Sequence, residues 1–134
     1  MKKKKAYVVA CAVLALDLKR IAGSRGMDLG TCFLPAGLHN SPDLLRQKLQ
    51  AAIDDISRKD DCERIIIGYG VCGRGTVGIR AGNIPLAIPK VHDCIALFLG
   101  GDDAYKRQFK KYPGTYYISA GWYEEKTEPI SQQR

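Results

Sequence analysis

The chain of 134 residues carries 21 Lys and Arg against 14 Asp and Glu, a formal net charge of +7, and 46% of its residues are hydrophobic. These values are typical of one globular domain and exclude a disordered or fibrous chain. No apolar run approaches the roughly 18 residues of a membrane-spanning helix, so we expect no membrane anchor.

Strand and helix patterns alternate along the chain. In chain order we predict strand 7–13, helix 14–22, strand 30–34, helix 42–59, strand 64–68, strand 84–88, helix 94–99, helix 103–111 and strand 115–119. Gly23 is expected to stop the first helix, and Ser41 to cap the second beside a proline and an acid. The alternation predicts an α/β fold for residues 1–134: a single three-layer domain with a mostly parallel, open, Rossmann-like sheet of about five strands.

Both ends of the chain differ from this pattern. Residues 1–5 form a basic N-terminal tail, and residues 123–134 a mostly polar C-terminal tail. The basic start followed by apolar residues 6–16 resembles a signal peptide. Cleavage before Cys11, however, would leave an apolar stretch of only about five residues, shorter than the roughly 7 to 15 required. The other charged runs, one basic and one acidic, are typical of solvated faces, so we predict no nucleic-acid partner.

The five cysteines are an odd number, and most of them lie in apolar runs. This pattern argues against the disulfide scaffold of a small secreted protein and favours reduced thiols in a cytoplasmic protein. We expect Cys62 to precede its strand at the amino edge of the sheet. Cys32 lies in mid-strand and is expected in the core.

Residues with soft or borderline ligand atoms stand at or just after the ends of predicted strands; they are Cys11, His39, Cys72, His92 and Cys94. Because the carboxyl ends of parallel strands meet at one crevice, we expect these residues to converge. Zinc takes Cys sulfur and His nitrogen, and three thiolates also suit iron or an iron–sulfur cluster. We therefore predict a metal site of Cys11, Cys72, His92 and Cys94. A purely structural, buried Cys11 is an equal alternative.

Two other functions are compatible with the same residues. Cys94 at a helix start could be a catalytic nucleophile, with His39 or His92 as its base. Residues 68–76 could instead cradle a small anion or cofactor, with Arg74 or Arg80 pairing its charge. The cofactor-binding residues would then be Gly70, Gly73, Arg74, Gly75, Thr76 and Trp122. The loop lacks the endings of the common phosphate-binding motifs, so it gives little support for a nucleotide.

Five blocks carry a resemblance to a known family: Cys-Ala-Val-Leu at 11–14, Gly-Leu-His-Asn at 37–40, Gly-Tyr-Gly-Val-Cys-Gly at 68–73 with Gly75-Thr76, Pro89 with His-Asp-Cys-Ile-Ala at 92–96, and Pro-Gly-Thr-Tyr-Tyr at 113–117 with Gly121-Trp122. In this order they resemble the domain of unknown function family 1638. Its members occur near corrinoid-dependent methyltransferases of methanogens and anaerobic bacteria and often continue beyond the Gly-Trp block.

The resemblance implies a place in corrinoid or methyl-transfer metabolism. A corrinoid or methyltransferase protein is the implied partner, and a metal or a small molecule is the implied ligand. The sequence also allows the protein to form a homo-oligomer. The chain has no Asp-x-His-x-x-Gly segment, so a corrinoid cofactor receives little support. We expect an accessory protein or enzyme that handles a metal, with a Cys-dependent enzyme and an anion-binding module as the alternatives.

Overall fold

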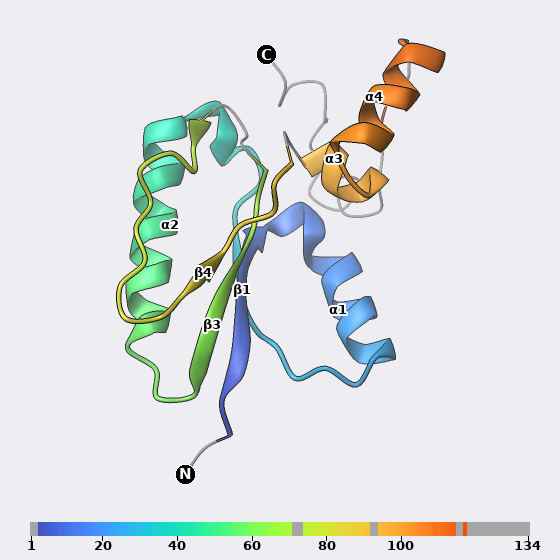
Figure 1. Cartoon of the computed structure of the whole chain (residues 1–134). Coiled ribbons are helices and arrows are strands. Elements are labelled where there is room, and N and C mark those ends of the chain that lie inside the picture. Colours follow the sequence, from blue (N-terminus) through green and yellow to red (C-terminus); the bar gives the residue numbers. More distant parts are fainter. Residues whose placement is uncertain (1–2, 71–73, 92–93, 115–116, 118–134) are drawn as a thin grey trace.

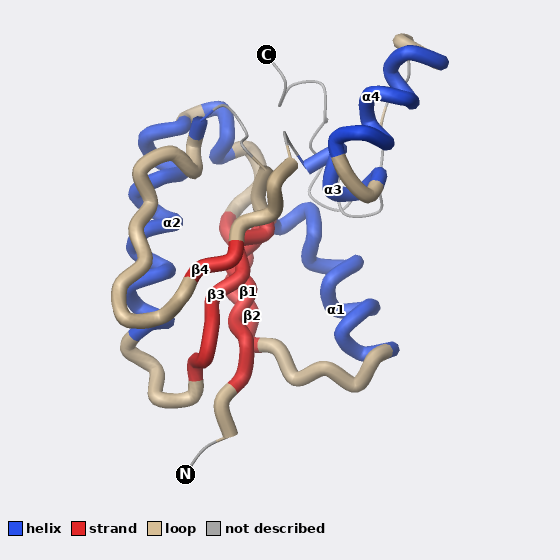
Figure 2. Tube along the Cα trace, in the orientation of Figure 1, coloured by secondary structure: helices blue, strands red, loops and turns tan. Residues whose placement is uncertain are grey.

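The computed structural model describes residues 3–70, 74–91, 94–114 and 117. A parallel sheet forms the centre of this part of the chain, in the order β2-β1-β3-β4 (Figure 2). Its strands are β1 (Lys5–Cys11), β2 (Gly30–Leu34), β3 (Cys62–Gly68) and β4 (Leu86–Ala87). The α/β prediction is confirmed, with four strands among the described residues. The predicted strand 115–119 lies outside them except for Tyr117.

Helices cover both faces of the sheet, as predicted for a three-layer fold (Figure 1). The helical elements are η1 (Ala12–Leu14), α1 (Ala15–Ser24), η2 (Leu38–Asn40), α2 (Pro42–Ser57), α3 (Cys94–Leu99) and α4 (Asp102–Lys111). In Figure 1, α2 lies on one face of the sheet, and α1 and α3 lie on the other. Within the described residues, no helix is both long and apolar enough to cross a membrane.

The apolar stripe of α2 forms most of one layer of the core. Its buried residues are Leu45, Leu49, Ile53 and Ile56, at the spacing of one helix face. The helix begins at Pro42, and Asp43 in its first turn pairs with Arg46 at 2.9 Å. The predicted cap is wrong, since the Ser41 side chain makes no capping hydrogen bond. Its backbone angles, φ −130° and ψ 79°, lie outside the extended region typical of a capping residue.

The first helix also differs from its prediction. A 3₁₀ turn, η1, precedes α1, which continues through Gly23 to Ser24. The chain turns two residues later, at Gly26, where φ is +61°. This left-handed conformation favours glycine, so Gly26, and not Gly23, supplies the turn.

Tyr7 fixes the amino edge of the sheet. It pairs with Gly30 of β2, where an added Cβ would lie 2.2 Å from the Tyr7 ring. The Tyr7 hydroxyl donates a hydrogen bond of 2.8 Å to Asp61, which precedes β3. This bond to Asp61, together with burial, raises the pKa of Tyr7 from 10.0 to about 12. The folded state therefore favours the neutral phenol.

We expect Tyr7→Phe to flatten the alkaline loss of stability. Between pH 10 and about 12 the unfolded chain releases the Tyr7 proton and the folded chain keeps it, so the stabilisation is complete below pH 10 and is lost as the pH rises. Urea unfolding at steps from pH 8 to pH 11.5 measures this slope. Tyr112→Phe, at an exposed tyrosine, is the control. Parallel curves for wild type and Tyr7→Phe would contradict the assignment.

Candidate functional site

The topology places a switch point at the carboxyl ends of β1 and β3. The chain leaves β1 through α1 to reach β2, and it returns from β2 through α2, on the opposite face, to β3. The connection that leaves β1 and the connection that enters β3 thus lie on opposite faces of the sheet. The carboxyl ends of these two neighbouring strands therefore form a switch point. Ligands bind at such points in open α/β sheets. We call this side of the sheet the carboxyl edge.

Gly68 lets the two central strands approach closely at the carboxyl edge. It pairs with Ala10, and a Cβ added to Gly68 would lie 2.5 Å from the Ala10 Cβ and 3.2 Å from its Cα. The two residues that follow, Tyr69 and Gly70, are buried. At this switch point the backbones of β1 and β3 are thus closely packed, with little room for a side chain at Gly68.

Two of the predicted ligands belong to elements that meet at the carboxyl edge. Cys11 is the last residue of β1 and only 2% exposed, and Cys94 is the first residue of α3, which follows β4. Cys72 and His92 lie outside the described residues. The part of the chain that the structure describes contains no group of three His, Cys, Asp or Glu side chains able to hold a metal. The four-residue site therefore stays a prediction.

The other two cysteines lie away from this edge. Cys62 is the first residue of β3, at the amino edge; it begins the strand that it was expected to precede. It is 2% exposed, and burial raises the pKa of its thiol, so the thiol stays neutral. Cys32 lies in β2 and is partly buried against the core, as predicted. Both serve as controls for the cysteines of the carboxyl edge.

The loop after β3 packs against α2. Arg74 has a left-handed backbone, with φ +71°, and an exposed side chain. Gly75 is buried, and a Cβ added there would lie 2.3 Å from Cδ2 of Leu45. Packing against α2 is sufficient reason for this glycine, without an anion. Thr76 is partly buried, whereas Gly73 and Trp122 lie outside the described residues.

Gln50 holds the same loop further along α2. Its side chain accepts a hydrogen bond from the Arg80 amide at 2.8 Å and donates one to the Arg80 carbonyl at 3.1 Å. Gln50 lies five residues beyond Leu45, about 7.5 Å along the helix axis. Arg80 is therefore further from the carboxyl edge than Gly75, and Arg74 is the better placed of the two arginines for an anion. No pattern in the sequence predicts this pair of hydrogen bonds between residues 30 positions apart.

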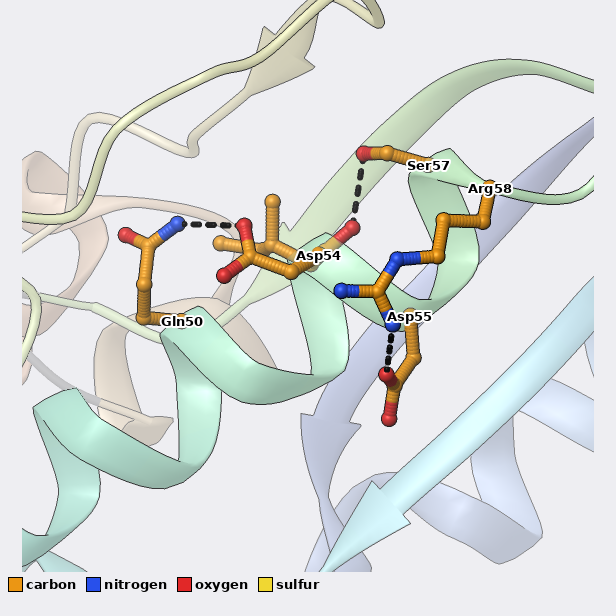
Figure 3. A network of polar contacts seen from close by, with 6 residues as sticks. Gln50, Asp54, Asp55, Ser57 and Arg58 are labelled. Atoms are coloured by element: carbon orange, nitrogen blue, oxygen red, sulfur yellow. Dashed lines mark hydrogen bonds and ion pairs between the residues drawn. The ribbon is translucent and has the colours of Figure 1, made fainter.

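Polar and charged side chains in the second half of α2 bond to one another or to the helix backbone (Figure 3). Gln50 donates to Asp54 at 3.0 Å, and Arg58 pairs with Asp55 at 3.1 Å. Ser57 donates to the carbonyl of Ile53 at 2.6 Å. Asp54 and Asp55, the first two residues of the acidic run, thus lie on the solvent-exposed side of α2.

Fold and topology define the class of this protein: a Rossmann-like α/β protein with a topological switch point between its two central strands. Its family is given by the sequence. The family model of DUF1638, a protein of unknown function, matches residues 33–133, which is more than half of the chain. The chain belongs to this family, as its sequence blocks predicted. The match includes Cys72, His92 and Cys94 and begins after Cys11. Comparisons with curated proteins and with solved structures find no match.

Proposed function

We propose that the protein binds a metal ion at the carboxyl edge through Cys11, Cys72, His92 and Cys94. One observation supports this proposal most: β1, β3 and β4 are consecutive neighbours in a parallel sheet. The segments that carry the four residues therefore leave the sheet next to one another, at the same edge.

The chain lengths allow the four residues to meet. Neighbouring strands are about 4.8 Å apart, so β1 and β4 are separated by about 10 Å. Cys72 follows the end of β3 by four residues, and His92 follows the end of β4 by five. An extended chain covers about 3.3 to 3.6 Å per residue, so both segments are long enough to reach a ligand position beside Cys11.

The ligand types determine the chemistry of the proposed site. Three thiolates and one imidazole form a usual tetrahedral set for zinc, and three thiolates also suit iron in a cluster. If Cys11 is a core residue instead of a ligand, three ligands remain and one position is open, at which the metal would activate a thiol or a methyl-group substrate as a Lewis acid. The family resemblance supports a role as an accessory protein or enzyme of corrinoid and methyl-transfer metabolism, in which a methyltransferase or corrinoid protein is the partner.

Metal analysis of two double variants tests the proposal. The protein is purified without oxygen and without a metal-affinity tag, and metal and acid-labile sulfide are measured per chain. We expect about one metal ion per chain in the wild type and loss of nearly all of it in Cys72→Ala/Cys94→Ala, which lacks two ligands. The matched control is Cys32→Ala/Cys62→Ala, which removes the same number of thiols away from the carboxyl edge and should keep the metal.

Two results would overturn the metal site. The first is full metal content in Cys72→Ala/Cys94→Ala; the second is equal loss from both double variants, which would indicate general destabilisation. A metal-free wild type with one fast-reacting thiol, lost in Cys94→Ala alone, would favour the nucleophile instead. Cys11→Ala, measured in the same way, decides whether Cys11 is a ligand or a core residue.

A further inference from the structure

The two helical layers of this protein pack very differently against the sheet. Four side chains of α2 are buried, whereas α1 has no buried residue. A cavity of about 510 Å³ lies between α1, the sheet and α3, and we call it the α1 cavity. Its walls include Val8, Leu18, Ile21, Ile66, Leu97 and Phe98. Small-molecule sites have volumes of roughly 300 to 1,000 Å³ and are mostly apolar, as this cavity is.

Asp17 gives this apolar cavity a charge. It is the only charged side chain among the described residues that line the cavity. Its Oδ2 is buried and has no hydrogen-bond partner in the described part of the chain. Of the two cations on α1, Lys19 and Arg20, Lys19 has its Nζ 5.8 Å from the centre of the Phe33 ring. A buried carboxylate oxygen without a donor is costly, so the cavity is complementary to a cation.

We propose that the α1 cavity binds a small amphipathic amine, whose ammonium group pairs with Asp17 and whose apolar body lies between α1 and the sheet. A purely apolar occupant would leave the Asp17 oxygen buried and unpaired. An anionic occupant would place two negative charges together in an apolar wall. An ammonium group supplies both the charge and the hydrogen-bond donors that Asp17 requires. This site is separate from the proposed metal ligands, none of which lines the cavity among the described residues.

Calorimetric titration with three probes of equal chain length tests the site: hexylammonium, hexanoate and 1-hexanol at pH 7. We expect saturable, one-to-one binding of hexylammonium only. Asp17→Asn, which keeps the size of the side chain, should weaken that binding about tenfold or more, because it removes a charged hydrogen bond. Asp54→Asn, at an exposed carboxylate on α2, is the control and should leave it unchanged. Ala22→Phe, which places an aromatic ring in the cavity and keeps Asp17, should weaken binding.

Other outcomes would overturn the proposal. Equal binding of hexanol or hexanoate would show that Asp17 does not select the ligand, and absence of saturable binding would show that the cavity is not a site for amines. A dimer in sedimentation that dissociates in Asp17→Asn would assign the cavity to a second copy of the chain. If the proposal holds, Asp17→Asn should raise the melting temperature of the free protein and reduce the further increase that hexylammonium causes. We expect Cys72→Ala/Cys94→Ala, which lacks two proposed metal ligands, to bind hexylammonium as the wild type does. This result would show that the amine site does not depend on the metal site.

Discussion

Replacing Leu49 by alanine is expected to lower the free energy of unfolding by about 3 kcal/mol, as Leu→Ala changes in closed cores do. The Leu49 side chain is 0% exposed and lies in the middle of the buried stripe of α2. Its removal leaves a cavity in the layer between α2 and the sheet, where rigid strands limit collapse. Urea unfolding followed by circular dichroism measures the change.

Two further leucines give this experiment its controls. Leu44, on the same helix, is 43% exposed, and Leu44→Ala should change stability by less than about 0.5 kcal/mol. Leu18 lines the α1 cavity and is only partly buried, so Leu18→Ala should cost about 1 kcal/mol. If Leu18→Ala costs as much as Leu49→Ala, the layer under α1 is as closely packed as the layer under α2, contrary to the structure.

Gly68→Ala is expected to destabilise the protein by about 3 kcal/mol, at the upper end of the range for overpacked positions. The added Cβ would lie 2.5 Å from the Ala10 Cβ, and the Ala10 backbone, at 3.2 Å, cannot rotate away as a long side chain would. Relief requires β1 and β3 to separate at the carboxyl edge. The proposed metal site therefore predicts that this variant holds less metal than the wild type.

Gly82→Ala is the matched glycine control. No atom lies within 4 Å of the position of its Cβ, and its φ is not positive. This substitution should therefore be neutral or slightly stabilising, by less than about 1 kcal/mol, because alanine restricts the unfolded chain. Equal unfolding midpoints for Gly68→Ala and Gly82→Ala would contradict the close approach of the two central strands.

The sequence predicts the elements with strong apolar patterns well and their ends less well. The isoleucine run of β3 and the stripe of α2 are typical of a parallel strand and a surface helix, and both are present. β4 is shorter than its predicted range, 84–88, and comprises only Leu86–Ala87. Pro85 and Pro89 flank it, and since proline has no amide hydrogen, neither can extend the donor side of the ladder.

The candidate sites differ in how far the sequence alone predicts them. The parallel sheet could be predicted from the sequence, and it brings Cys11 and the start of α3 to the same side; the ligand set itself stays a prediction. The place of Asp17 in the wall of the α1 cavity was not predicted, although a signal was present. Asp17 lies three residues after Leu14 and four before Ile21, on the apolar face of α1, where a carboxylate is unusual. The two hydrogen bonds between Gln50 and Arg80 depend on the tertiary fold, and no local sequence pattern predicts them.

The central position of β1 has a consequence for synthesis of the chain. Tyr7 of β1 pairs with Ile65 of β3, 58 residues further on. At about 5 to 20 residues per second, a ribosome needs about 3 to 12 seconds to make that length. During this time the apolar run of β1 has no partner on its β3 side, a state in which nascent strands aggregate. The exposed Lys3 and Lys4 directly precede the run, and their charge would act as a gatekeeper that keeps nascent chains apart until β3 emerges.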